Sequence, residues 1–469
     1  MILTLIASQA LAGAIDQVEV GGPWGTPTAT DATAIWWNPA GLAAGEGTRF
    51  MGEAAPISAV LAIERDDPFG RGGKDVYTTL GVVPFAGVAT DLGVKGLGLG
   101  AGFVVPYANG ATSEIEDPHG RYHLRSGLNQ HFFYMLGAGY EYQDRFAIGV
   151  AGALIQGEYA AHLDTSLVPQ LDGEIANMGE ESGYTDELVE DPDYAATLTY
   201  KDDGSRAFTF SAGSRVVITD QVVVGLAYIH GFKAKHRGNY ELDFDCPPQS
   251  DTLGRFGAEQ FDLCYANLLA DGGVSFGMPA RFHMGVQVTP IDNLRLELMG
   301  GWVGWHAFED YLIEIENVEE LNELDNPETA DLVNQTKVWA RDGQDAAWFA
   351  LDAKMDPIDV LTIGTRITRD GSAIPDHALS QNNYDAASIR LSGLVAVRPV
   401  PQLEIGASIT GYFLQDRLVE DSSFSLLVSE ETEDRWAYPH ANGLYQSATT
   451  RFGLSVRGHF AKPDPDTRP

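Results

Sequence analysis

Five arginines are the residues of this sequence best suited to bind an anionic group. They occupy polar positions in segments where polar and apolar residues alternate, and they are Arg281, Arg295, Arg366, Arg390 and Arg451. A guanidinium presents parallel N–H donors that match the two oxygens of a carboxylate. Each arginine could therefore bind the carboxylate headgroup of a ligand or pair with an acidic side chain of the chain itself. For any single arginine, a structural Arg–Glu ladder is the commoner arrangement.

Two cysteines form the other reactive pair. Cys246 and Cys264 are close in sequence and lie in one loop-like stretch. In an exported protein we expect them to form a disulfide, which stabilises by very roughly 3 kcal/mol for a loop of this size. No Cys-x-x-Cys pair or histidine cluster accompanies them, so we expect no metal site.

Motifs for catalysis or nucleotide binding are not found. Ser455 and His459 share a strand face but would be about 13 Å apart, too far for a nucleophile and its base. The sequence has no Gly-x-Ser-x-Gly and no phosphate-binding loop, so we expect neither an enzyme nor a cofactor. Its 66 acidic residues outnumber 30 basic ones, for a net charge of -36. This charge excludes nucleic acid as a partner because phosphate would be repelled.

The elements that position these side chains follow from a period of two in hydrophobicity. In Arg281–Thr289, Phe282 and Met284 fall on one face, whereas Arg281 and His283 fall on the other. Such alternation predicts a strand with one apolar and one polar face. The strands are long and their polar faces carry Arg, Glu and His, which fits apolar faces in lipid and polar faces lining a lumen. No stretch approaches the ~18–20 uninterrupted apolar residues of a membrane helix.

Fourteen such segments are predicted. They are 49–63, 76–87, 97–107, 129–142, 146–162, 207–218, 222–244, 276–289, 294–315, 346–356, 359–370, 388–398, 403–416 and 447–460. From the fourth strand on, the connections alternate between short turns and long acidic loops, as in a closed barrel with periplasmic turns and outer loops. We therefore expect an all-β, 14-stranded antiparallel transmembrane β-barrel. A closed barrel has no edge that needs a partner, so a monomer is expected.

The N-terminal part of the chain is predicted to lie outside the barrel wall. Residues 1–14 are expected to be a signal peptide, with an apolar run followed by small residues but no basic region. Residues 15–48 are rich in Gly, Ala and Thr and are too long for a simple tail. Folded inward, this hatch would plug the lumen of the barrel at 49–460. Residues 461–469 would form a periplasmic tail.

The segment Ala32–Ala43 contains Asn38-Pro39-Ala40-Gly41 and resembles the hatch motif of the FadL/TodX family of outer-membrane proteins. Gly225–Tyr240, and Arg369–Pro375 with Ser380 and Asp385, are similar to later parts of the same family, so the resemblance spans most of the chain. Pro39 disfavours the helical region for Asn38. The amide of Asn38 is then expected to hydrogen bond neighbouring backbone, which is a structural role.

The resemblance implies a function. Family members take up long-chain fatty acids or other hydrophobic small molecules passively across the outer membrane of a Gram-negative bacterium. Ligand would bind a groove in the outer loops, pass to a lumen pocket as the hatch moves, and leave sideways into membrane lipid. The loop-groove candidates, which could equally be local loop packing, are Leu167, Leu171, Phe261 and Leu268. An alternative is a non-transporting barrel that acts as a shuttle or anchor in protein secretion.

The resemblance also places the sideways exit at a kink in the third strand, Leu97–Tyr107. The kink candidates here are Gly102, Phe103 and Pro106. Proline cannot donate a ladder hydrogen bond, so Pro106 independently predicts a bulge or gap. A strand that simply ends at the membrane interface is the other interpretation of Pro106.

Overall fold

The computed structural model describes residues 19–66, 72–166, 195–243, 268–316, 337–422, 426–429, 435–437 and 440–460. The predicted signal peptide, the C-terminal tail, Cys246 and Cys264 lie outside the described residues. The loop-groove candidates Leu167, Leu171 and Phe261 do so too, and Leu268 is described only as a strand position. None of the helices in the described ranges is long and apolar enough to cross a membrane.

The elements are mostly strands. The helical ones are η1 (Gly22–Trp24), α1 (Ala34–Trp37), η2 (Pro39–Leu42), η6 (Trp305–Ala307) and η8 (Asp376–Ala378). The strands are β1 (Thr48–Arg65), β2 (Lys74–Thr90), β3 (Leu97–Ser113), β4 (Ser126–Tyr142), β5 (Phe146–Ser166), β6 (Ala195–Asp202), β7 (Ser205–Thr219), β8 (Val222–Ile229), β9 (Phe232–Asp243), β10 (Leu268–Met278), β11 (Arg281–Ile291), β12 (Leu294–Val303), β13 (Asp310–Glu316), β14 (Lys337–Ala340), β15 (Ala346–Ile358), β16 (Leu361–Asp370), β17 (Ser388–Val400), β18 (Leu403–Leu414), β19 (Arg417–Val419), β20 (Leu426–Ser429), β21 (Arg435–Ala437) and β22 (Gly443–Phe460).

These strands form a single closed ring. β1 pairs antiparallel with β2 on one side and with the last strand, β22, on the other. Several wall strands are interrupted, so that β6 and β7, β8 and β9, β10 and β11, β12 and β13, β14 and β15, and β18 and β19 continue one another along the wall. The short strands β20 and β21 pair beside β14 and do not count as separate wall strands. With these pieces joined, the wall is a closed 14-stranded antiparallel barrel, which confirms the predicted fold class.

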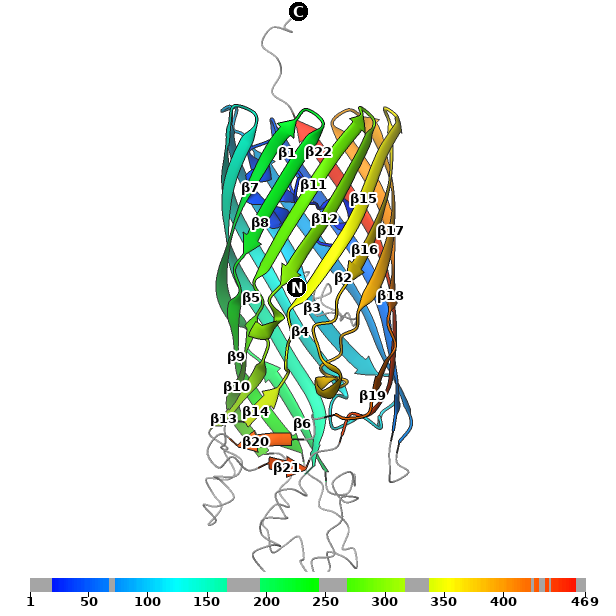
Figure 1. The fold of residues 1–469 in the computed structure, drawn as a ribbon. Helices are drawn as coiled ribbons and strands as arrows, with labels where there is room; N and C mark the ends of the chain where they lie inside the picture. Colours follow the sequence, from blue (N-terminus) through cyan, green and yellow to red (C-terminus); the bar gives the residue numbers. More distant parts are fainter. Residues whose placement is uncertain are drawn as a thin grey trace, which may run out of the picture.

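The two ends of the barrel differ. Short turns such as the one between β4 and β5 lie at the upper end of Figure 1, and strands that flank the long connections, such as β6 and β13, reach the lower end. In outer-membrane barrels the short turns face the periplasm and the long loops face outward. The upper end in Figure 1 is therefore the periplasmic end, and the lower end is the loop end.

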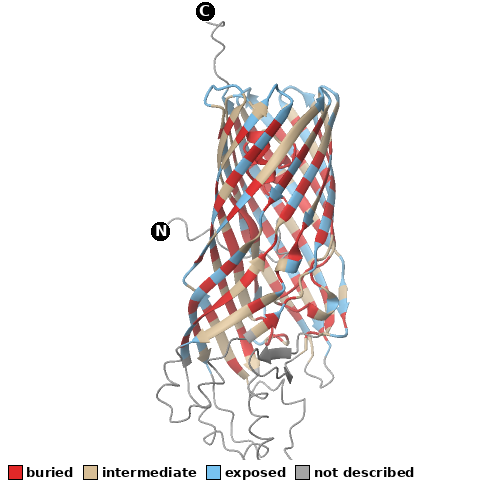
Figure 2. Cartoon of the chain, turned by 60° about the vertical axis from the view of Figure 1, so that its left-hand side comes forward, coloured by how far each residue is buried: buried red, intermediate tan, exposed pale blue. Residues whose placement is uncertain are grey.

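Side chains alternate between the lumen and the outer surface along each strand (Figure 2). On β22, Phe452, Leu454 and Val456 are exposed, whereas Arg451 and Ser455 are buried. A row of exposed apolar side chains is stable only in lipid, so this surface is the membrane face. Arg451 therefore points toward the lumen.

Exposed aromatic residues border the membrane face at both ends. Tyr140, Tyr142 and Phe146 lie beside a periplasmic turn. The exposed aromatics toward the loop end, here called the outer aromatic belt, are Tyr134, Phe208, Phe210, Tyr228, Phe282, Trp302, Phe349 and Phe413. Aromatic side chains favour the boundary between hydrocarbon and headgroups. The two groups therefore mark the two membrane interfaces.

Residues 19–47, here called the hatch, lie inside the barrel near its periplasmic end (Figure 1). They include η1, α1 and η2, and Trp36 and Trp37 on α1 are fully buried. The short elements contact β3, β4, β5 and β7, so the hatch is packed against the wall.

Candidate functional site

The Asn-Pro-Ala-Gly motif anchors the hatch. The Asn38 amide donates to the carbonyl oxygen of Pro27 at 2.8 Å and to that of Ser214 on β7 at 2.9 Å, and its oxygen accepts from the Ala40 N–H at 3.2 Å. Pro39 begins η2, where its missing N–H costs nothing. Ala40 and Gly41 complete this buried turn. One side chain thus ties two turns of the hatch to the wall.

Glycines form the part of the wall that the motif contacts. A Cβ at Gly149 on β5 would collide with the backbone of Pro39 and Ala40, and a Cβ at Gly213 on β7 would collide with the Asn38 amide. The hatch therefore rests directly on strand backbone at these positions. This close approach fixes where the hatch can sit.

Buried ion pairs hold the rest of the hatch. Arg366 on β16 donates to Asp352 at 3.0 Å and to the carbonyl oxygens of Pro23 at 2.8 Å and Gly25 at 3.0 Å. Arg451 on β22 donates to Glu53 at 2.9 Å. Both guanidinium groups are almost fully buried. Removing one member of such a pair strands a buried charge, so these contacts are costly to break.

A hatch carboxylate joins the same group. Glu19 accepts hydrogen bonds from Ser392 at 2.9 Å and Thr410 at 3.0 Å, and it lies 4.0 Å from Arg451. Arg390 pairs with Asp370 nearer the loop end. The structural-ladder alternative thus fits Arg366, Arg390 and Arg451, because their buried charges already face carboxylates of the chain.

The other two predicted arginines have different surroundings. Arg295, just after the periplasmic turn between β11 and β12, is partly exposed and also pairs with a carboxylate, that of Asp356 at 3.4 Å. Arg281 is buried, donates from Nε to the Tyr107 hydroxyl at 2.9 Å and lies over the Tyr107 ring at 4.8 Å from its centroid. The five side chains therefore do not converge on one headgroup site.

The loop-side half of the lumen is aromatic. Ring contacts of 4.5–6.4 Å between centroids join residues of β3, β4, β5, β9, β10 and β13. We call this set the aromatic cluster; its members are Tyr107, His131, Phe133, Tyr159, Phe232, Phe276 and Tyr311. The alternation of residues predicts only that apolar strand faces contact lipid, so this inward-facing cluster was not predicted from the sequence. Aromatic residues on otherwise polar faces were the signal that could have found it.

The barrel wall is interrupted between β2 and β3. Ladder pairs join Tyr77 and Thr78 to the end of β3, and pairing resumes only at Phe85–Val104. On the other edge of β3, the register with β4 shifts between Val104 and Tyr107. Pro106, which cannot donate a ladder hydrogen bond, lies in both interruptions. We call this feature the wall break; it lies in the loop-side part of β3.

Two of the three kink candidates lie outside the wall break. Gly102 pairs regularly with Gly87 and Met135, and a Cβ there would lie 2.7 Å from Ile35 of the hatch. Phe103 packs against Tyr134 in the outer aromatic belt. The sequence-based placement of the kink was therefore too early by a few residues, except for Pro106.

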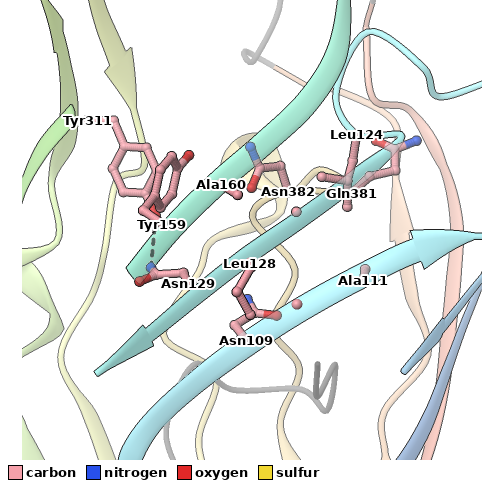
Figure 3. A pocket seen from close by; sticks show the side chains of 12 residues that line it. Asn109, Ala111, Leu124, Leu128, Asn129, Tyr159, Ala160, Tyr311, Gln381 and Asn382 are labelled. Atoms are coloured by element: carbon pink, nitrogen blue, oxygen red, sulfur yellow. Dashed lines mark hydrogen bonds between the residues drawn. The ribbon is translucent and has the colours of Figure 1, made fainter. Parts of the chain in front are cut away.

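A small cavity of about 30 Å³ adjoins the wall break (Figure 3). Asn109, Gly110 and Ala111, from the stretch of β3 that has no ladder pairs with β2, form one side of it. Tyr159 and Tyr311 of the aromatic cluster lie on another side, where Asn129 donates to the Tyr311 hydroxyl at 3.3 Å. The volume suffices for a water molecule or two. A larger ligand would have to displace side chains.

The segment 371–387 between β16 and β17 folds into the lumen and supplies the remaining side of the cavity. Gln381 and Asn382 line it (Figure 3). Gln381 is buried, and within the described residues neither polar atom of its amide has a hydrogen-bond partner. A buried unpartnered amide costs free energy that a polar ligand atom would recover. From the sequence, this loop was identified only by its resemblance to a late segment of the FadL/TodX family, and its fold into the lumen was not predicted.

One acidic group in this loop, that of Asp385, is also buried. Asp385 accepts from the Ala373 N–H, and Arg417 donates to the Asp385 carbonyl oxygen at 2.9 Å. Burial raises the pKa of the Asp385 carboxyl to about 7, and nearby Asp370 adds to the rise. No cluster of His, Cys, Asp or Glu suited to a metal ion occurs in the described ranges.

The closed wall, the apolar outer belt and the occupied lumen define an outer-membrane β-barrel with an internal plug. The chain belongs to the family described as "Outer membrane protein transport protein (OMPP1/FadL/TodX)", whose model matches residues 3–381. It is therefore a transport protein of the Gram-negative outer membrane and not an enzyme. A search of curated proteins finds no match.

Solved structures share the fold. A FadL homologue of Pseudomonas aeruginosa has a TM-score of 0.72 at 15% identity and covers 97% of this chain and 100% of its own. The toluene transporter TodX of Pseudomonas putida has a TM-score of 0.64 at 14% identity, covering 96% and 99%. The CymD monoaromatic hydrocarbon channel has a TM-score of 0.60 at 14% identity, covering 92% and 94%. At such identities the likeness concerns the fold alone.

Proposed function

We propose that this protein takes up hydrophobic small molecules passively, with long-chain fatty acids as the first candidates. Ligand enters from the loop end, rests among the aromatic cluster and the cavity, and leaves through the wall break into lipid. Movement of the hatch enlarges the cavity during passage. No energy source is required, because an apolar molecule partitions from water into the lumen and then into the bilayer.

The observation that carries the proposal is the coincidence of the cavity with the wall break. Asn109, Gly110 and Ala111 line the cavity and belong to the stretch of β3 that lacks ladder pairs with β2. On the lipid side of the same place, Leu80 of β2 is 67% exposed. A molecule in the cavity is therefore separated from lipid by side chains and not by a hydrogen-bonded ladder.

The lining favours ligands that have a polar end. Gln381 supplies a donor and an acceptor without partners in the described residues, and Asn109 and Asn382 add further amides. The arginines of the hatch half are already paired with acids. A carboxyl or hydroxyl end would hydrogen bond to the amides, while its chain would contact the aromatic rings. Purely apolar hydrocarbons would gain only the second interaction.

The test is uptake by cells that express filling variants. Ala111→Trp occupies the cavity, and we expect it to lower uptake of labelled oleate at least tenfold. Val60→Trp places the same side chain on the lipid face of β1 and should leave uptake unchanged. Gln381→Leu, which retains the cavity walls, should lower oleate uptake several-fold while leaving toluene uptake within twofold.

Folding is monitored by the heat-dependent gel mobility of the barrel. If folded Ala111→Trp protein transports oleate and toluene like the native protein, the route through the cavity is wrong. If native protein neither transports these compounds nor retains any hydrophobic molecule on purification, uptake itself is wrong.

A further inference from the structure

A group of basic side chains stands on the outer surface just beyond the aromatic belt at the loop end. Arg206 on β7, Lys233 and Lys235 on β9, and Lys201 on β6 are all exposed. We call these four the basic patch. A concentration of cations is unexpected in a chain with 66 acidic and only 30 basic residues.

Strand register brings the four side chains together. β6 pairs with β9 so that Lys201 lies opposite Asn239, and β7 pairs with β8 so that Ser211 lies opposite Ile229. No ladder pairs join the strands in between, but backbone hydrogen bonds from His230 N–H to Phe210 and from Asp203 N–H to Arg237 lie on either side of the gap, so Arg206 lies across from the stretch that carries Lys233 and Lys235. Outward side chains on neighbouring strands lie within roughly 5–8 Å of one another. Three cations therefore form one surface group, with Lys201 a short distance toward the loops.

Their height corresponds to lipid headgroups. Phe208 is 66% exposed in the belt, and Arg206 is two residues farther along the same strand, about 7 Å. Below the patch, His230 stacks on Phe210 and hydrogen bonds to the Tyr228 hydroxyl at 3.0 Å. β9 continues beyond β8 toward the loop end (Figure 1). The patch therefore follows directly after the hydrocarbon boundary.

The positive charge of the patch is not neutralised by the described chain. Among the described residues, none of the four has a carboxylate within 4.0 Å, whereas Arg237 beside them lies 3.9 Å from both Glu314 and Glu316. The nearby Glu158 accepts a hydrogen bond from Gln130 at 2.6 Å. Asp203 is exposed on the loop side of the patch. Three neighbouring cations that have no carboxylate within 4.0 Å among the described residues form a surface suited to binding an anion.

We propose that the basic patch binds the phosphate groups of the phosphorylated glycolipid in the outer leaflet of the outer membrane. The phosphates contact Arg206, Lys233 and Lys235, and the acyl chains lie along Phe208, Phe210 and Tyr228. Guanidinium and ammonium groups are the usual partners of phosphate, and each cation near an anionic surface strengthens binding. The site is independent of the transport route, because all these side chains face away from the lumen.

The patch also explains how so acidic a barrel is held in an anionic leaflet. Like charges repel, and a net charge of -36 opposes contact with phosphate. A local cationic surface at the headgroup level replaces that repulsion with attraction on one side of the barrel. The glycolipid bound there would remain with the protein through purification in mild detergent.

The experiment measures binding of lipid A to the purified full-length protein by native mass spectrometry. The probes are bisphosphorylated lipid A, the same lipid A with its phosphates removed, and inorganic phosphate. The variant is R206Q/K233Q/K235Q. Its matched control is K74Q/K95Q/R145Q, which removes one arginine and two lysines that are exposed elsewhere.

We expect the triple variant to bind bisphosphorylated lipid A roughly 30-fold more weakly and the control to bind within twofold of native. The charge-conserving variant R206K/K233R/K235R should restore binding. Equal affinity of native protein for dephosphorylated lipid A would overturn the proposal in favour of acyl-chain contacts. Displacement of the lipid by millimolar inorganic phosphate would overturn it in favour of a free-anion site. Unchanged binding by the folded triple variant would also overturn it.

Discussion

The two halves of the lumen are built from different interactions. In the periplasmic half, the hatch rests on glycine backbone and is held by buried ion pairs such as Arg366–Asp352 and Arg451–Glu53. In the loop-side half, aromatic rings contact one another beside an interrupted wall, and the buried Gln381 amide makes no hydrogen bond to the described residues. Directional contacts specify one arrangement, whereas ring contacts tolerate several. Position is therefore fixed in the periplasmic half, and adaptability is provided in the loop-side half.

The energetic difference has a structural origin. A side chain in the periplasmic half that moves must leave a paired charge or a carbonyl unsatisfied, which costs several kcal/mol. A ring in the loop-side half that rotates exchanges one apolar contact for another. Substitutions in the two halves should therefore differ in both size and kind of effect.

The largest effect is expected from Arg366→Ala. It leaves Asp352 with Lys354 as its remaining partner and removes the donors to Pro23 and Gly25. The free energy of unfolding should fall by about 3–5 kcal/mol, and the hatch should loosen so that ion conductance in planar bilayers rises. Arg369→Ala, on the exposed face of the same strand, is the control. Native conductance in the folded Arg366→Ala protein would contradict a fixed hatch.

A smaller effect is expected from Gly213→Ala. The added methyl group collides with the Asn38 amide, and overpacking of this kind costs about 1–3 kcal/mol. Urea unfolding measures the change. Gly393→Ala is a matched control, since a Cβ there would be 3.9 Å from its nearest neighbour. Equal effects at the two glycines would show that the hatch does not depend on close backbone contact.

The substitution Phe276→Leu tests the ring contacts in the loop-side half of the lumen. Phe276 stacks on Tyr311 with centroids 4.5 Å apart, so leucine loses an aromatic pair but little volume. We expect a loss of about 1 kcal/mol in unfolding free energy and a several-fold drop in retained ligand, measured by mass spectrometry. Phe349→Leu, on the lipid face, should change neither. A loss as large as that of Arg366→Ala would remove the distinction between the halves.

The smallest effect concerns pH and the loop 371–387. Burial raises the pKa of Asp385 to about 7, against opposing N–H groups of Ala373 and Ala386 and the charge of Arg417. The raised value means that the loop is most stable with the carboxyl protonated. This contribution is fully present below about pH 4 and is lost as pH rises to about 7.

Hydrogen exchange of the loop between pH 4.5 and 8 measures this loss. Asp385→Asn cannot ionise, so its opening free energy should be nearly independent of pH over this range. Asp220→Asn, in an exposed periplasmic turn, should retain the native pH dependence. A pH-independent native loop would refute the assignment to Asp385.

The strands could be predicted from sequence by one rule, which is that side chains facing lipid must be apolar. Phe282 and Met284 alternate with Arg281 and His283, and the structure points the first pair to lipid and the second to the lumen. The aromatic cluster escaped prediction because the rule says nothing about the inner face: Phe133 and Tyr159 point inward although they are apolar or aromatic.

The wall break was only partly predictable. Pro106 indicated it, because the missing N–H is a property of one residue. Its extent depends on a change of register between β2 and β3, which neither strand encodes alone. The position of Gln381 depends on how 371–387 folds over the lumen, and no period in the sequence describes that path.

The close contact of the hatch with Gly149 on β5 and Gly213 on β7 has a consequence for assembly of the barrel. The hatch precedes β1, and β1 closes the ring against β22, the strand synthesised last. The hatch is therefore enclosed only when the last strand, β22, pairs with β1. At these glycines no wall side chain lies between the hatch and the strand backbone. No wall side chain there has to rearrange after β22 pairs with β1. Gly149 and Gly213 thus matter for the order in which the barrel assembles as well as for its final structure.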